Sequence, residues 1–73
     1  MDDPDRLKIA VMQMLAHNEA HIQRYDTWVD MAASNGLVDS ADLLREAKHC
    51  AELEANTLRR VLEHIAVISK NDP

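Results

Sequence analysis

The sequence predicts an all-α protein, an antiparallel two-helix hairpin that dimerises into a four-helix bundle. Three observations predict this fold class. Helix-favouring residues dominate the 73-residue chain, which has no Phe, one Gly and two Pro. Turn-forming residues interrupt the helical pattern once, near the middle of the chain. Each helical segment also carries an apolar stripe that is too broad for one partner helix to cover. We therefore expect residues 1–73 to form a single hairpin domain.

The first helix is expected over about residues 4–34. Asp3 is its predicted N-cap, Pro4 takes the first helical position, and Asp5 places a favourable acid in the first turn. No Gly or Pro interrupts the segment until residues 34–36 (Ser-Asn-Gly), where Asn or Gly can adopt the left-handed conformation that ends a helix.

A turn at residues 35–39 leads into the second helix, which is expected over about residues 40–70. Asp39 and Ser40 offer an N-cap, and residues 71–73 (Asn-Asp-Pro) end the helix. A connection of about five residues makes consecutive helices antiparallel neighbours. At 1.5 Å per residue, each helix should be roughly 45 Å long.

Both helices carry more apolar surface than a hairpin can bury. The lines expected to face each other are Leu7, Val11, Met14, Asn18, Ile22, Tyr25, Val29 and Ala32 in the first helix, and Leu44, Ala47, Ala51, Glu54, Leu58, Val61, Ile65 and Ile68 in the second. Second lines run beside them: Ala10, Met14, His17, His21, Trp28 and Met31, and Leu43, Ala47, Cys50, Glu54, Thr57, Val61 and His64. We expect a homodimer to bury these second lines, because a chain this short is marginally stable alone.

Charge and composition exclude several classes of function. A net charge of −5 disfavours nucleic acid and anionic membranes as partners, and no apolar run approaches the roughly 18 residues of a membrane span. Cys50 is the only cysteine, and the N-terminus is unlike a signal peptide, so we expect a cytoplasmic protein. No Gly-rich phosphate loop, nucleophile–base pair or paired inward carboxylates occur, and a hairpin builds no loop pocket, so an enzyme is not expected.

Polar residues interrupt the apolar lines near the middle of the predicted bundle. If the turn centres near Leu37, residues whose numbers sum to about 74 face each other, because both helices advance by the same rise per residue. This register gathers His17, Asn18, His21, Glu54 and Thr57 in one layer. Such a layer can fix register and oligomeric state, as a buried Asn does in coiled coils. It can also bind a metal.

The metal hypothesis depends on His17 and His21, which lie one helical turn apart and project from the same face. Imidazole nitrogens suit Ni, Zn or Cu rather than Mg or Ca, and bundle cores are common places for such sites. Two-fold symmetry could supply four imidazoles to one ion. Glu54 could ligate the ion or orient a ring. Further possible supporting donors are Met14, Cys50 and His64, although each also fits an ordinary packing or surface position.

The stretch HNEAHIQRYDTWVDMAASNGL, His17 to Leu37, resembles CooJ-type nickel chaperones, accessory proteins of carbon monoxide dehydrogenase. In that family a helical hairpin dimerises and nickel binds near the dimer interface. The family motif has a His-Trp pair followed by two further histidines at four-residue spacing. Its second and third histidines correspond to His17 and His21, whereas Gln13 and Met14 stand at the positions of the His-Trp pair. No histidine follows His64, so the family's His-rich tail has no counterpart in this sequence.

Two candidate functions follow. The resemblance and the His pair together imply a nickel-binding accessory protein, a metallochaperone-like cytoplasmic homodimer of the carbon monoxide dehydrogenase maturation type, with nickel(II) as its ion and a client metalloenzyme as its partner. The alternative is a metal-free helical dimer that acts as an adaptor or regulatory protein-interaction module. In that case the polar layer only sets the register.

Overall fold

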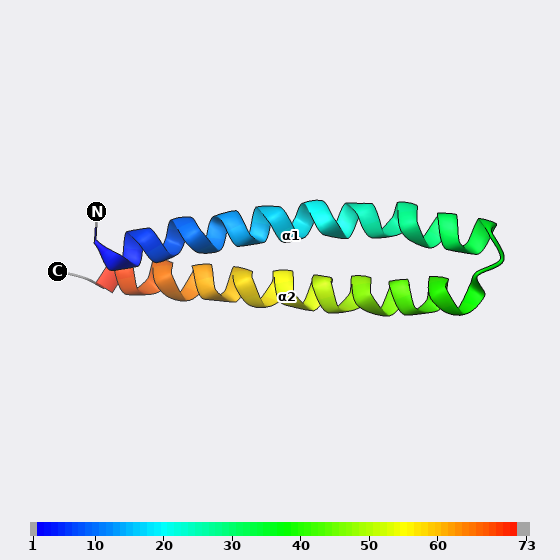
Figure 1. Cartoon of the computed structure of the whole chain (residues 1–73). Coiled ribbons are helices and arrows are strands. Elements are labelled where there is room, and N and C mark those ends of the chain that lie inside the picture. The colour runs from blue at the N-terminus through cyan, green and yellow to red at the C-terminus, as the bar shows by residue number, and fades with distance from the viewer. Residues whose placement is uncertain (1, 72–73) are drawn as a thin grey trace.

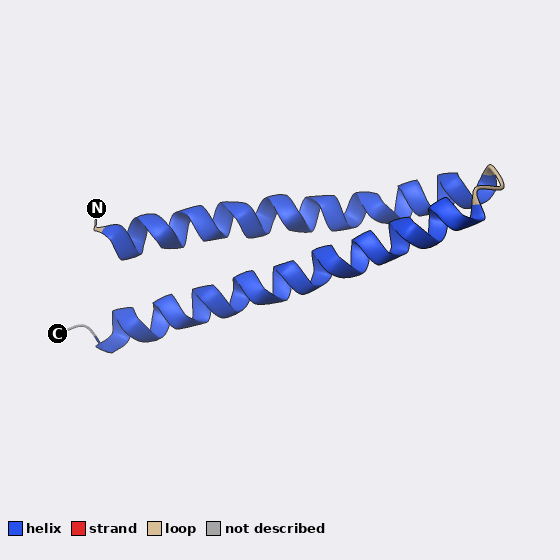
Figure 2. Cartoon of the chain, turned by 60° about the horizontal axis from the view of Figure 1, so that its bottom comes forward, coloured by secondary structure: helices blue, strands red, loops and turns tan. Residues whose placement is uncertain are grey.

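The computed structural model describes the backbone of residues 2–71 and the side chains of residues 2–67. It contains two helices, α1 (Asp3–Ser34) and α2 (Val38–Asn71), and no strand within those residues. The helices lie side by side in opposite directions, so the start of α1 and the end of α2 are at the same end of a rod 59 Å long (Figures 1 and 2). The all-α hairpin is thus confirmed. Neither helix, over the residues described, combines the length and the apolar character of a membrane span.

The start of α1 is capped by a carboxylate, as predicted, but by a different one. The Oδ1 atom of Asp2 accepts a hydrogen bond of 3.1 Å from the backbone N–H of Asp5. Asp2 is therefore the N-cap, and Asp3 is already helical. Pro4 is tolerated in this first turn because the N–H that it lacks has no helical acceptor there.

The turn is shorter than predicted and spans only residues 35–37. Gly36 has a φ of +76°, and the N–H groups of Gly36 and Leu37 donate to the carbonyls of Ala33 and Ala32. This pair of bonds is a Schellman motif, which satisfies the last carbonyls of α1. The carbonyl of Leu37 then accepts from Ala41 at 2.9 Å, so α2 begins two residues before the predicted start. The second helix was predicted to stop at residues 71–73; Asn71 is still helical, and residues 72–73 lie outside the described residues.

A narrow seam of mostly small side chains joins the helices. Its buried apolar members are Val11, Val29, Ala32, Ala41, Ala51, Ala55, Leu58 and Ile65. Ala41 and Ala55 are each only 1% exposed, which shows that the helices approach closely where these methyl groups lie. Such a seam buries little apolar area, so most large apolar side chains stay accessible in the single chain.

The predicted facing lines need three corrections. Leu7 and Met14 are about half exposed, at 52% and 51%, and Glu54 is exposed as well. On α2 Ala55 takes the place predicted for Glu54, because the buried line rises from Ala51 by four residues and then by three to Leu58, whereas the prediction placed the three-residue step first. The side chain of Ile68, also assigned to this line, lies outside the described residues.

Among the described side chains, two ion pairs join the helices along one side of the seam. The Lys48 Nζ atom lies 2.7 Å from Asp26 Oδ1, and the Arg59 Nη2 atom lies 2.7 Å from Glu19 Oε1. The hydrogen bond from Lys48 to Asp26, with the charge of Asp26, raises the pKa of Lys48. Both pairs agree with the predicted register, in which residues near 26 lie level with residues near 48.

Candidate metal site in an open groove

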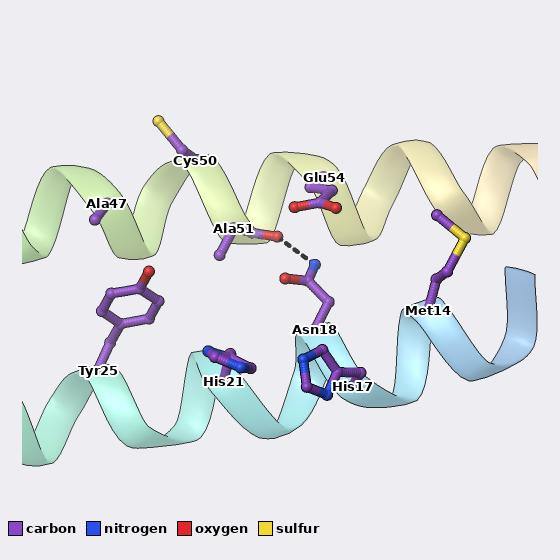
Figure 3. Close-up of a pocket in the computed structure, with 9 residues that line it drawn as sticks. All are labelled: Met14, His17, Asn18, His21, Tyr25, Ala47, Cys50, Ala51 and Glu54. Atoms are coloured by element: carbon purple, nitrogen blue, oxygen red, sulfur yellow. Dashed lines mark hydrogen bonds between the residues drawn. The ribbon is translucent and has the colours of Figure 1, made fainter.

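An open groove runs between α1 and α2 on the side of the seam away from the ion pairs. It has a volume of about 680 Å³ and lies near the middle of the hairpin. Its walls are formed by Met14, His17, Asn18, His21 and Tyr25 from α1, and by Ala47, Cys50, Ala51 and Glu54 from α2 (Figure 3). The groove is therefore where the second apolar lines predicted for the two helices meet.

His17 and His21 stand next to each other on the α1 wall. Their ring centroids are 4.6 Å apart, with an angle of 62° between the ring planes, and both residues are exposed. The uninterrupted helix α1 fixes this spacing, because residues four apart lie above one another on the same face. The two imidazoles are thus held close enough to bind one ion and are accessible from outside the chain.

Asn18 forms the floor between the two walls. It is 9% exposed, and its Nδ2 atom donates a hydrogen bond of 2.8 Å to the carbonyl of Ala51 on α2 (Figure 3). This bond crosses the seam and fixes the register of the two helices at this level. No buried side-chain nitrogen or oxygen within the described part of the chain lacks a partner. The structure therefore gives Asn18 a structural role that needs no ion.

The α2 wall supplies Cys50 and Glu54, one turn apart and both exposed (Figure 3). Cys50 is a free thiol. Across residues 2–67, no three His, Cys, Asp or Glu side chains come together closely enough to hold a metal ion within one chain. One chain thus presents the His pair and two separate donors, and any fuller ligand set needs atoms from outside the chain.

The structure places most of the predicted supporting residues at the groove, but not all of them. Met14, Cys50 and Glu54 line the groove, whereas the exposed His64 does not. The hydroxyl of Thr57, which was expected in the polar layer, donates to the carbonyl of Leu53 on its own helix at 3.0 Å. The predicted layer therefore assembles without Thr57.

The comparisons with known proteins place the chain in one family. A family model described as "Domain of unknown function (DUF8180)" matches residues 7–65. The chain belongs to this family. No curated protein and no solved structure matched the chain. The matched span covers every residue that lines the groove, so the His pair and its surroundings lie inside the family domain.

The sequence analysis did not place Tyr25 in this groove. Tyr25 was assigned to the seam between the helices, yet it is half-buried and also forms part of the groove wall. The available signal was its spacing, because Tyr25 follows His21 by one helical turn and must share part of its face. Beyond the groove, toward the turn, Trp28, Met31 and Leu43 are 50%, 53% and 65% exposed. The apolar surface thus continues past the histidines.

Proposed function

We propose that this chain is a metal-binding helical homodimer, a nickel-binding accessory protein that holds its ion with His17 and His21. One observation carries the proposal: two exposed imidazoles with centroids 4.6 Å apart on the wall of an open groove. Such a pair is a ready-made bidentate ligand for a divalent transition metal. Because both rings are exposed, an ion can reach them without rearrangement of the chain.

The proposed partner is a second copy of the chain, which completes a four-helix bundle. In support, Trp28, Met31 and Leu43 are each at least half exposed, and their helical spacing from His21 and Ala47 puts them on the face that carries the groove. A contiguous apolar face of this kind marks an interaction surface. A 73-residue hairpin with a seam of small residues also buries too little apolar area for high stability alone.

The choice of nickel and of a client enzyme rests on the resemblance to CooJ-type chaperones. Imidazole donors suit nickel(II), zinc(II) and copper(II) alike, so the donor atoms set the class of metal and the resemblance selects within it. The function that we propose is to bind nickel and deliver it in the cytoplasm to a metalloenzyme of the carbon monoxide dehydrogenase type. An accessible ligand pair suits delivery, because an incoming client can reach the ion.

The alternative function is that of a metal-free helical dimer, an adaptor or regulatory interaction module. The hydrogen bond from Asn18 to Ala51 favours it, because this bond gives the polar layer a role in setting register without any metal. The same apolar face would then serve assembly alone.

A nickel titration followed by calorimetry separates the two functions. The test variant is the double change His17→Ala/His21→Ala, and the matched control is His49→Ala/His64→Ala, which removes two exposed histidines outside the groove. We expect the test variant to lose the nickel site and the control to keep it, with helical circular dichroism unchanged in both. Equal nickel binding by the two variants, or none by the wild type, would refute the nickel assignment and favour the adaptor.

A further inference from the structure

A second copy can close the groove in two ways, and each brings different residues together. In a four-helix bundle each helix packs against two neighbours, one of which is already its own hairpin partner. If the two turns lie at opposite ends, α1 packs on α1 of the partner and α2 packs on α2. If the turns lie at the same end, α1 of each copy packs on α2 of the other. The two-fold axis lies across the bundle in the first case and along it in the second.

The groove residues lie around the centres of their helices, so they are near the two-fold axis when the turns are at opposite ends and beside it when the turns are at the same end. The midpoint of α1 (Asp3–Ser34) falls beside Asn18, and the midpoint of α2 (Val38–Asn71) falls beside Glu54. With turns at opposite ends, Glu54 therefore meets Glu54 of the partner subunit. With turns at the same end, Glu54 lies level with the other copy's α1 near its midpoint, where His17 and His21 stand.

Charge distinguishes the two arrangements. Among the side chains that the structure describes, no Lys or Arg lines the groove, so within residues 2–67 only the His pair can carry positive charge or hold a cation beside Glu54. Two carboxylates pressed together in an otherwise apolar interface repel each other and lose hydration without compensation. A carboxylate set against an imidazole pair gains a hydrogen-bonding partner or shares its bound ion. Charge complementarity therefore favours turns at the same end.

The observed register supports the meeting of Glu54 with the partner's histidines. Within one hairpin, Asn18 bonds to Ala51 and Glu19 pairs with Arg59, so residues near 18 on α1 lie level with residues between 51 and 59 on α2. In a bundle with turns at the same end, the two-fold axis preserves these levels between copies. Glu54 then faces the stretch of the partner's α1 that includes His17 and His21.

We propose that a second copy covers the groove with both turns at the same end, and that its Glu54 completes a cation site with His17 and His21. The dimer then has two equivalent sites, each with two imidazole nitrogens from one copy and a carboxylate from the other. This inference rests on the proposed metal binding for its ligand and on the groove alone for its geometry. Three protein donors leave coordination positions open, so the ion stays accessible to exchange.

Mixing two defective variants tests whether the ligands come from different copies. One variant carries His17→Ala/His21→Ala and keeps Glu54, and the other carries Glu54→Gln and keeps the histidines. We expect the Glu54→Gln homodimer to bind nickel at least about tenfold more weakly, whereas Glu63→Gln, on the exposed side of α2, changes nothing. After the two defective variants exchange subunits at equal amounts, about a quarter of the wild-type tight sites should return, because half the dimers then contain one complete site. No recovery overturns the shared site.

A distance measurement tests the arrangement independently of metal. A nitroxide on Ser34→Cys, in a chain that also carries Cys50→Ser, marks the turn end of α1. We expect about 20–30 Å between the two labels if the turns share an end, from helix spacings of 8–10 Å and the label arms. Turns at opposite ends separate the labels by roughly 45 Å or more, from the rise per residue. The longer distance, or a monomer in solution, overturns the arrangement. A short distance without nickel binding by the wild type keeps the arrangement and refutes the cation site together with the proposed function.

Discussion

Replacing Asn18 with Asp tests the buried contact that fixes the register of the helices. The two side chains have nearly the same shape, so the change alters hydrogen bonding and charge but not volume. The Nδ2 atom of Asn18 donates to the carbonyl of Ala51 at 2.8 Å, and the residue is only 9% exposed. In the Asn18→Asp variant an oxygen that cannot donate faces that carbonyl oxygen at neutral pH. The helices must then either bury an unpaired charge or separate locally.

The magnitude follows from these two effects. Loss of the hydrogen bond costs about 1 kcal/mol, and a poorly hydrated carboxylate without a donor adds about 2 kcal/mol. The free energy of unfolding should therefore fall by about 3 kcal/mol, a large part of the stability of a small protein. For a 73-residue chain that loses this contact, the melting temperature should fall by roughly 12–24 °C. Circular dichroism melts and urea titrations at one fixed chain concentration measure both quantities.

The same variant should recover stability at acidic pH. Burial beside a carbonyl raises the pKa of the introduced carboxyl in the folded chain above its unfolded value, so the folded state binds the extra proton more tightly. The deficit relative to wild type is then largest at neutral pH and shrinks as the pH falls toward about 4, where the neutral acid can donate to Ala51. The matched control is Asn56→Asp at an exposed position, which should change stability by less than about 0.5 kcal/mol. Equal stability of the two variants at neutral pH would show that Asn18 is not held in a buried contact.

Three further perturbations test the seam, the turn and the ion pairs. Ala55→Leu should destabilise the fold by about 1–3 kcal/mol in urea titrations, because Ala55 is 1% exposed, whereas Ala66→Leu at an exposed position should be nearly neutral. Gly36→Ala should cost about 1–2 kcal/mol in the same assay, because φ is +76°. The cost comes from the backbone alone, since no atom lies within 4 Å of an added Cβ. Gly36→Asn should cost less, because Asn tolerates the left-handed region. Asp26→Asn removes the carboxylate that raises the pKa of Lys48. The small advantage of wild type over this variant should be present at neutral pH and should be lost as the pH rises through the pKa of Lys48 in the folded chain, which lies above its usual value of 10.5.

Much of the fold could be predicted from local signals in the sequence. One Gly near mid-chain and two Pro near the termini leave only one place for a turn, and the Schellman motif at Gly36 lies there. The predicted first and last residues of the helices were less accurate, because several neighbouring residues satisfy the same capping rule. Asp2 and Asp3 can each cap α1, and only the geometry of the chain shows that Asp2 accepts from Asp5.

The candidate site could be predicted in outline but not in its details. The four-residue spacing of His17 and His21 placed both rings on one face, which the structure shows. Which residues lie in the seam and which line the groove was harder to predict. An apolar stripe wider than the contact with one helix does not reveal which of its residues face which neighbouring helix. Glu54 and Met14 belonged to both predicted lines, and the close approach at Ala51 and Ala55 leaves them on the groove side.

The polar residues at mid-hairpin differ in whether their own chain supplies a hydrogen-bond partner. This difference distinguishes a residue with a structural role from residues that are candidates for binding. Asn18 is buried and bonded to Ala51, so its requirement is met before any partner arrives. His17, His21 and Glu54 line an otherwise largely apolar face that a second copy would cover, yet no set of three donors converges among the described residues of one chain. Covering such groups without partners would cost more than the apolar burial around them returns. A dimer that uses this face must therefore supply partners for them, from its own second chain or from a bound ion.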